Sequence, residues 1–390
     1  MKSNYYGTFN YILFGESHSE EIGIIIEGLK EGLSFDFNEI EEQLKLRQGG
    51  MIFNTPRQEK TDFEITTGYE FGKTTGEALC IVFKNNDIVK KDYDHLLVQP
   101  RPGHADYVGS IKYKDNQLGS GGSHFSGRMS TPLVAAGAIM QQVIKKDYPN
   151  LDILTHINSF QGIKDYNYYQ LRKQTIVDLF DYFDIEHCIQ LDPSLQKELA
   201  TMIRPRLYNK LSSPSDILIN EYLENDIIEK ACSLKDNRDS AGGELETIIM
   251  NLPTGIGDPF FDSLESKLSS FIFSIPSIKG ISFGSDSLKN EIGSNVKDEF
   301  LYLDKKQAYT LYNFNGGING GISNGDDIVF KTSIKPIASI NQIQYTYNYE
   351  ADSIKPLEIG GRHDATIINR IIPIIDAVSY IVLAEFLYKR

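Results

Sequence analysis

The chain has 390 residues and a formal net charge of −14, from 39 basic and 53 acidic residues. Its composition is that of an ordinary globular protein, and the acidic balance argues against nucleic acid or an anionic membrane as a partner. The cysteines Cys80, Cys188 and Cys232 form no metal-like or CxxC spacing and fit a reducing cytoplasm. We find no secretory signal, and the apolar run 371–384, interrupted by Asp376, is too short to cross a bilayer.

The first predicted helix covers residues 36–47. Asp36 is placed as its N-cap, and Glu39 stands at the capping-box position three residues on. Basic residues occupy the last turn, and Gly49-Gly50 is expected to end the helix.

A second helix is predicted over residues 130–146, with Thr131 as its cap and Pro132 at the first helical position. A glycine- and serine-rich loop ending in Arg128 precedes it. Backbone amides at such a helix start favour an anion.

A third helix is predicted over residues 370–389, with a wide apolar face and Pro373 near its start. Strand-like runs cover residues 244–252, 279–283 and 327–334. The polar, helix-prone segment 194–235 is expected to form a surface excursion. We find no linker and expect one large α/β or α+β domain over residues 1–390.

Three histidines lie in glycine- or arginine-marked loops beside a carboxylate. Each loop by itself also suits a local turn, but together they favour a site, because histidine moves protons near neutral pH and arginine holds anions. The three loops are Gly15-Glu16-Ser17-His18, Arg101-Pro102-Gly103-His104-Ala105-Asp106 and Gly360-Gly361-Arg362-His363-Asp364.

Two glycine-rich loops, residues 119–127 and 313–325, either cradle phosphate or form simple turns. Neither has the Walker or dinucleotide spacing, so the residues alone predict an anion site and nothing finer. No HExxH or HxxxH pattern supports a metal site, and no Gly-x-Ser-x-Gly elbow supports a hydrolase.

These loops, in this order, resemble the chorismate synthase family from about Gly15 to the end of the chain. The matching pieces are Gly-Glu-Ser-His (15–18), Arg-Gln-Gly-Gly (47–50), Arg-Pro-Gly-His-Ala-Asp-Tyr (101–107), Val-Ala-Ala-Gly-Ala-Ile (134–139), Asp-Ser-Ala-Gly-Gly (239–243), Gly-Gly-Ile-Asn-Gly-Gly-Ile-Ser-Asn-Gly (316–325), Lys-Pro (335–336) and Gly-Arg-His-Asp (361–364).

The resemblance implies a lyase that makes chorismate by anti 1,4-elimination of phosphate from 5-enolpyruvylshikimate 3-phosphate, the last common step of the shikimate pathway. Reduced FMN is required without net redox change, and NADPH is a candidate reductant. The implied fold is a β-α-β sandwich with helices between antiparallel sheets, assembled as a cytoplasmic homotetramer. Two alternatives stay open: a flavin enzyme acting on a related phosphorylated cyclohexene acid, and a non-catalytic flavin- or anion-binding homologue.

The resemblance also implies residue roles. His18 is the acid near the substrate phosphate, His104 protonates the reduced flavin, and Asp364 keeps flavin N5 ready to take the ring proton. Substrate anions fall to five arginines: Arg47, Arg57, Arg101, Arg128 and Arg362. Flavin contacts fall on Ser126, His124, Gly320, Lys335, Ser339 and Arg362 and, more loosely, on Pro276 and Ser277. No residue is assigned to a metal.

The chain departs from the family pattern in the loop expected to contact the flavin. His124 stands where relatives carry an arginine and Phe125 where they carry a serine, and Ser19 replaces a glycine. Because histidine is only partly charged at pH 7, we expect weaker binding of FMN.

Overall fold

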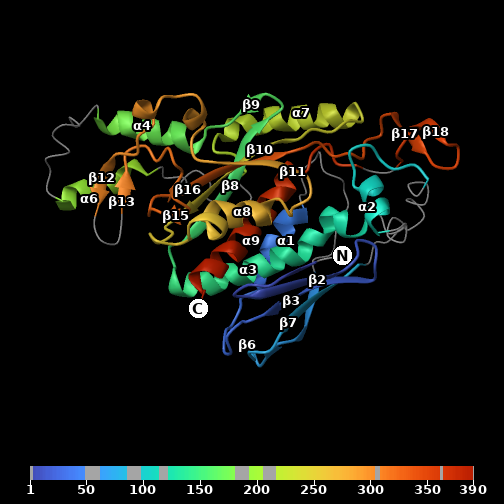
Figure 1. The fold of residues 1–390 in the computed structure, drawn as a ribbon, viewed down its shortest axis with the longest axis horizontal. Coiled ribbons are helices and arrows are strands. Elements are labelled where there is room, and N and C mark those ends of the chain that lie inside the picture. Colours follow the sequence, from blue (N-terminus) through green and yellow to red (C-terminus); the bar gives the residue numbers. More distant parts are fainter. Residues whose placement is uncertain are drawn as a thin grey trace.

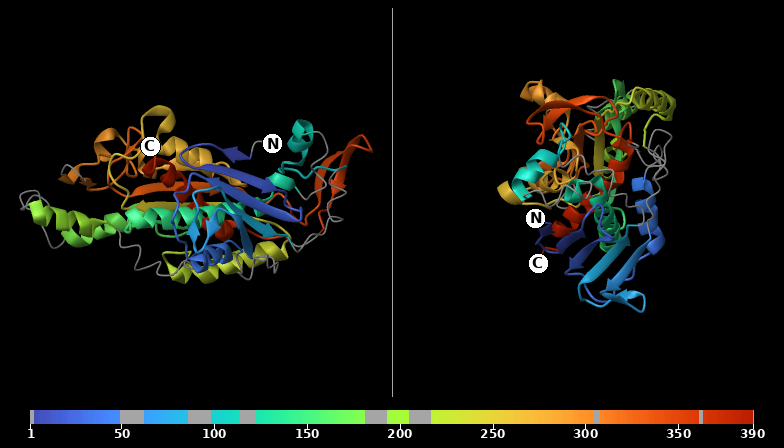
Figure 2. Two further views of the ribbon diagram at one scale, coloured as in Figure 1. Left: turned by 90° about the horizontal axis from the view of Figure 1, so that it is seen from below. Right: turned by 90° about the vertical axis from the view of Figure 1, so that its right-hand side faces the viewer.

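Two five-stranded antiparallel sheets enclose a layer of helices (Figures 1 and 2). The computed structural model describes residues 3–48, 62–85, 98–113, 122–180, 193–204, 217–303, 308–360 and 363–389. The first sheet has the order β1-β2-β3-β7-β4, with bounds Asn4–Tyr5, Asn10–Gly15, Glu21–Glu27, Leu79–Lys84 and Phe63–Thr67. The second has the order β11-β16-β10-β8-β9, with bounds Ile278–Phe283, Ile328–Ile334, Gly243–Met250, Asp152–Phe160 and Ile163–Lys164. The expected β-α-β sandwich is confirmed.

The helices between the sheets are α1 (Phe37–Gln48), α3 (Ser130–Asp147) and α9 (Ile368–Leu387). Helix α3 packs against β3 and β7, and α9 packs against β8 and β10. Since α9 also meets α1, α3 and α8 (Leu264–Ile272), it is buried on almost every side, which explains its nearly continuous apolar sequence.

The remaining elements lie around this sandwich. The helices are α2 (Asp106–Tyr113), α4 (Tyr168–Phe180), α6 (Pro193–Ile203) and α7 (Glu224–Asp236), with short 3₁₀ turns at Ser123–Phe125, Gly127–Met129, Glu221–Leu223, Phe260–Asp262, Asp286–Lys289 and Gly293–Asn295. The two-stranded pairs are β5–β6 (Tyr69–Glu70, Lys73–Thr74), β12–β13 (Phe300–Leu303, Ala308–Thr310), β14–β15 (Ile318–Asn319, Ile322–Ser323) and β17–β18 (Gln344–Asn348, Ser353–Leu357).

The predicted elements agree closely with the structure. The three predicted helices correspond to α1, α3 and α9, and the three strand-like runs correspond to β10, β11 and β16. Asp36 is the N-cap of α1, since its Oδ1 accepts the Asn38 amide hydrogen bond at 2.9 Å. Gly49-Gly50, which was expected to end this helix, lies outside the described residues. Within the described residues, no helix combines the length and apolar character that a membrane crossing requires.

The predicted cap of the second helix is wrong. The helix begins at Ser130, one residue before Thr131, because the 3₁₀ turn Gly127–Met129 runs directly into it. Ser126 caps that turn instead, as its hydroxyl accepts the Arg128 amide at 3.3 Å.

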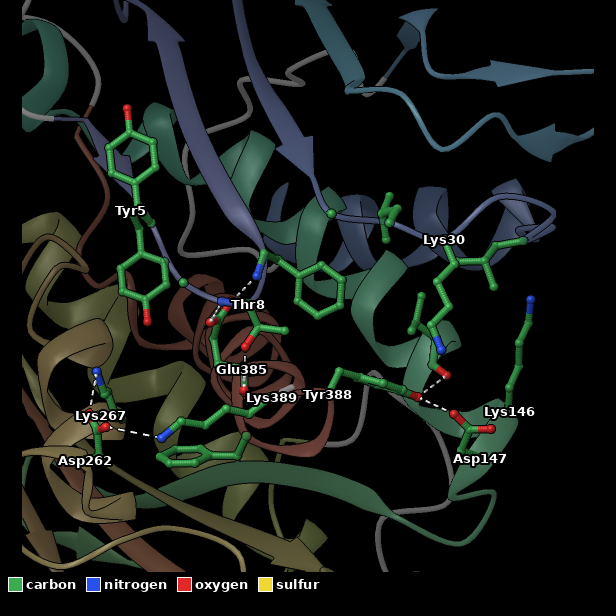
Figure 3. Close-up of a pocket in the computed structure, with 18 residues that line it drawn as sticks. Tyr5, Thr8, Lys30, Lys146, Asp147, Asp262, Lys267, Glu385, Tyr388 and Lys389 are labelled. Carbon is green, nitrogen blue, oxygen red and sulfur yellow. Dashed lines mark hydrogen bonds and ion pairs between the residues drawn. The ribbon is translucent and has the colours of Figure 1, made fainter.

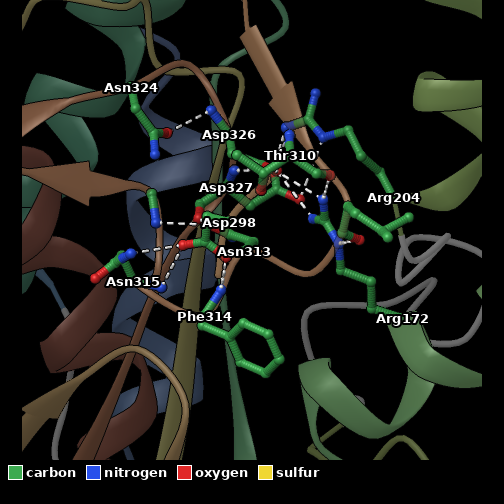
Figure 4. A network of polar contacts seen from close by, with 12 residues as sticks. Arg172, Arg204, Asp298, Thr310, Asn313, Phe314, Asn315, Asn324, Asp326 and Asp327 are labelled. Atoms are coloured by element: carbon green, nitrogen blue, oxygen red, sulfur yellow. Dashed lines mark hydrogen bonds and ion pairs between the residues drawn. The ribbon is translucent and has the colours of Figure 1, made fainter. Parts of the chain in front are cut away.

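The second glycine-rich loop is held by a buried polar network (Figure 4). Arg172 of α4, 1% exposed, donates to both carboxylate oxygens of Asp326 at 3.0 and 2.9 Å. The Asn313 side chain accepts the Gly317 amide at 2.7 Å and donates to the Asp327 carbonyl at 2.8 Å. These hydrogen bonds therefore hold the loop against α4 and against the start of β16.

Helices α3 and α9 approach each other closely where Gly137 of α3 meets Ala377 of α9. A Cβ atom on Gly137 would overlap both the Cα and the Cβ of Ala377. Glycine in mid-helix normally costs stability, so its presence here reflects the close crossing of two backbones.

Gly137→Ala is expected to lower the free energy of unfolding by about 1–3 kcal/mol, because the added methyl group overpacks this crossing. An open helical site would instead gain about 0.5–1 kcal/mol from the same change. Urea denaturation measures the difference. Gly293→Ala, with no atom within 4 Å of its new Cβ, is the control and should be near neutral. A stabilised Gly137→Ala variant would contradict the tight crossing.

Candidate active site

His18 lies on the turn that follows β2 and is 6% exposed. Its Nδ1 is 2.9 Å from the hydroxyl of Ser17, a fully buried neighbour. The Ser17 carbonyl in turn accepts a hydrogen bond from Arg128 Nη1 at 2.8 Å. The predicted acid and a predicted anion-binding arginine are thus brought together.

Arg47, in the last turn of α1, reaches the same loop. Its Nε donates to Ser130 Oγ at 2.9 Å and its Nη2 donates to the Gly127 carbonyl at 3.0 Å. Arg47 and Arg128 are each 8% exposed. We call His18, Arg47 and Arg128 the anion group.

A second cluster forms at the N-terminus of α2. Asp106, 1% exposed, accepts hydrogen bonds from the Arg101 amide at 3.0 Å, from Arg101 Nε at 2.7 Å and from Arg101 Nη2 at 2.8 Å. Its Oδ1 also lies 2.6 Å from His104 Nδ1. Burial alone would raise the pKa of Asp106, but the hydrogen bonds from Arg101 and His104 outweigh burial and hold it well below its usual range. The ionised carboxylate favours a proton on His104 Nδ1, so a second proton on this ring would sit on Nε2.

The glycine- and serine-rich loop joins the two clusters. Gly122 has φ +96°, and a Cβ there would lie 3.3 Å from Cε1 and 3.8 Å from Nε2 of His104. Six residues later the same loop carries Arg128 of the anion group. One short segment thus has His104 at one end and His18 near the other.

The flavin residues expected near Lys335 are partly brought together. Ser339 accepts a hydrogen bond from Arg101 Nη1 at 3.0 Å, and Lys335 Nζ donates to the Gly103 carbonyl at 2.5 Å. The Lys335 amide donates to the Ser277 carbonyl at 3.0 Å. Burial, with a smaller effect from the charge of Lys279, lowers the pKa of Lys335. We call Arg101, His104, Asp106, Lys335 and Ser339 the α2 group.

Asp364 lies just before α9 and pairs with a residue in the first turn of that helix. Its carboxylate is 3.3 Å from Arg370 Nη1. The next carbonyl, that of Ala365, accepts the Ala241 amide at 2.9 Å, which docks the Asp-Ser-Ala-Gly-Gly segment beside it. Gly242 of that segment packs on the end of β16, where a Cβ would overlap the Ile334 carbonyl.

The two substituted residues of the loop have partners outside both clusters. The His124 ring Nδ1 lies 3.3 Å from Ser3 Oγ, and burial lowers the pKa of His124, so it is less charged at pH 7 than a free histidine. The Phe125 ring lies against α2 near Gly109 and Tyr113.

Four predicted residues are not placed in either cluster by the described part of the chain. Arg57 and Arg362 lie outside the described residues. Gly320 is exposed in the β14–β15 turn, and the next residue, Gly321, packs on the segment that leads into α8. Pro276 precedes Ser277 and has no described contact with a predicted ligand residue.

A pocket of about 850 Å³ lies elsewhere, between the chain's first strands and the C-terminal ends of α3 and α9 (Figure 3). It contains none of the predicted site residues. Two of its lysines, Lys267 and Lys389, pair with Asp262 at 3.1 and 3.3 Å. Because α3 runs from the anion group to this pocket, the two places are at opposite ends of one helix.

The fold is a β-α-β sandwich whose described residues gather arginine and histidine side chains and a buried carboxylate around one loop. The family model for chorismate synthase matches residues 9–388. The chain is 34% identical to the chorismate synthase of Methanocaldococcus jannaschii, covering 100% of this chain and 97% of the relative. It is 34% identical to that of Saccharomyces cerevisiae, covering 97% and 94%. A crystal structure of chorismate synthase matches with a TM-score of 0.67 at 20% identity, over 99% of this chain and 92% of the other. The chain belongs to the chorismate synthase family and is an enzyme of the lyase type that acts on a small molecule.

Two contributors were missed by the predictions from sequence. Asp106, which fixes both Arg101 and His104, was visible two residues after His104 in the same motif. Ser17 precedes His18 in the sequence, but a serine gives no signal of its own for orienting an imidazole.

Asp106→Asn is expected to lower the free energy of unfolding at pH 7 by about 3 kcal/mol, because it leaves the buried Arg101 without its counter-ion. A depressed carboxyl pKa stabilises the protein above the unfolded value of about 3.9 and does so less as pH falls. The difference in free energy of unfolding between the wild type and the variant should therefore shrink by about 1 kcal/mol as the pH falls from 5 to 3.

Urea denaturation at pH 7, 5 and 3 checks this, with Asp258→Asn as control, since the Asp258 side chain is 58% exposed. A pH-independent difference would mean that Asp106 is not the ionised partner of Arg101 and His104.

Proposed function

We propose that this enzyme converts 5-enolpyruvylshikimate 3-phosphate to chorismate by anti 1,4-elimination, with reduced FMN as cofactor. The observation that carries the proposal is the loop at residues 122–128, which has a proton-transfer histidine near each end within a chain of this family. A pure flavin binder has no need of two oriented imidazoles, so the catalytic function is favoured.

The anion group suits the leaving phosphate. Arg47 and Arg128 are positively charged and buried, and their hydrogen bonds to loop oxygens help to position them, so they would stabilise the charge that builds on the departing group. Ser17 orients the His18 ring, which would protonate that phosphate.

The α2 group suits the flavin. The hydroxyl of Ser123 is 1% exposed and has no hydrogen-bond partner among the described residues, which fits a loop shaped around an oxygen-rich ligand. His104, Lys335, Ser339, Ser126 and, from outside the described residues, Arg362 would hold the flavin. Bound reduced FMN would supply electron density and a nitrogen that accepts the ring proton. His104 would hold a proton at Nε2 facing the flavin, and Asp364 would keep the accepting nitrogen in the right protonation state.

Gly320, Pro276 and Ser277 remain proposed flavin contacts, and His124 becomes the weakest of these proposals because its ring turns to Ser3. We also propose NADPH as the ultimate reductant, a homotetramer as the working assembly and the cytoplasm as the compartment. Stopped-flow reduction of FMN by NADPH and light scattering of the purified chain test the first two.

The purified protein should form chorismate anaerobically with photoreduced FMN and almost none with oxidised FMN. Chorismate absorbance and phosphate release, followed together, measure the reaction. Equal turnover without any flavin, or phosphate release without chorismate, would overturn the proposal.

His104→Ala and His18→Ala should each lower kcat at least about tenfold while the protein remains folded, in line with the loss of acid catalysis. His156→Ala is not a suitable control because His156 is fully buried beside Glu246. His124→Ala, whose ring turns to Ser3, should keep kcat within about threefold. A wild-type rate in His104→Ala or His18→Ala would show that its role is misassigned.

A further inference from the structure

We propose that Phe125 is a positioning residue that seats its ring in a notch left by Gly109 on α2 and so sets the distance between His104 and the anion group. The kinetic part of this inference rests on the proposed function, whereas its geometric part does not. Phe125 stands where the family pattern has a serine, so the device belongs to this chain.

The notch is defined by an absent side chain. A Cβ atom on Gly109 would lie 2.9 Å from Cε2 of Phe125, closer than real Cβ contacts allow, and 3.5 Å from Cζ. The ring edge therefore rests on the backbone of α2 itself. One turn later, the Tyr113 ring centroid lies 6.4 Å from that of Phe125, which extends the contact along the helix.

The contact joins the two clusters mechanically. Helix α2 starts at Asp106, which holds Arg101 and His104, and Gly109 lies one turn beyond it, with its amide bonded to the Ala105 carbonyl at 2.7 Å. On the other side, Phe125 lies three residues before Arg128. A shift of the ring would move one cluster relative to the other.

The loop meets the α2 region at two points. Gly122 lies against the His104 ring, and Phe125 lies against Gly109 three residues later. Two contacts define an orientation where one would allow the loop to pivot. Ser123, between the two points, has φ +46°, a conformation that is costly for a residue other than glycine and needs support from its surroundings. The Phe125 ring supplies that support.

The test is a double-mutant cycle in which Gly109→Ala lowers the rate when Phe125 is present but not when Phe125 is replaced by leucine. Gly109→Ala improves helix propensity, so without the ring it should not harm the protein. With Phe125 present, the new methyl group must displace the ring. We expect Gly109→Ala to lower kcat about tenfold with a smaller change in KM, and Phe125→Leu to lower it by less. The pair Gly109→Ala with Phe125→Leu should regain most of the loss, because the smaller side chain leaves room for the methyl group.

The matched control is Gly293→Ala, outside both clusters, where an added Cβ meets nothing within 4 Å. It should leave kcat and the melting temperature unchanged. A purely structural role for the ring would move the melting temperature and the rate together. A positioning role lowers kcat in protein that remains folded at the assay temperature.

A second readout is independent of the reaction. In protein labelled with ¹⁵N-histidine, the imidazole signals of His104, assigned with His104→Ala, should shift in Gly109→Ala and return in the double variant. Unshifted His104 signals together with an unchanged kcat in Gly109→Ala would overturn the inference. A wild-type protein that makes no chorismate but shows these shifts would refute the proposed function and leave the positioning role standing.

Discussion

The site depends on the crossing of two helices where no side chain separates them. Gly137 brings α3 onto Ala377 of α9, and both helices begin at the candidate active site. Helix α3 starts directly after the loop that carries Arg128, and α9 starts four residues after Asp364. Because both helices are packed between rigid sheets, the distance at their crossing fixes how far apart their N-termini lie. The geometry of the site is therefore set in the core, away from the reacting groups.

The charges of the site have two different uses. Arg47 and Arg128 are buried cations whose partners include the hydroxyl of Ser130 and the carbonyl oxygens of Gly127 and Ser17. Arg101 is instead bound through its guanidinium to the buried Asp106, so that pair adds little net charge. We infer that Arg101 serves mainly to orient the Asp106 carboxylate and, through it, the His104 ring. An arginine in a motif that predicts an anion site can thus orient other side chains instead of binding the anion.

Periodicity and capping residues predicted the main helices and strands, because burial of one face leaves a direct trace in the sequence. The start of α3 was missed because a 3₁₀ turn extends a helix without changing its apolar pattern. The partners of His124 and Phe125 could not be foreseen, since Ser3 and Gly109 are distant in the chain and carry no motif. Family resemblance predicted which residues belong to the site but not which of them lie together. Gly320, for example, is exposed in the β14–β15 turn, outside both clusters.

The position of α9 in the chain order has a consequence for biosynthesis. Both sheets and every other helix precede it, so they leave the ribosome before the element that separates them exists. Until α9 is made, the inner faces of β8 and β10 have no cover, and the nascent chain exposes a broad apolar surface. The second sheet can bury its inner face only after α9 is made, so we expect the sandwich to close late in folding.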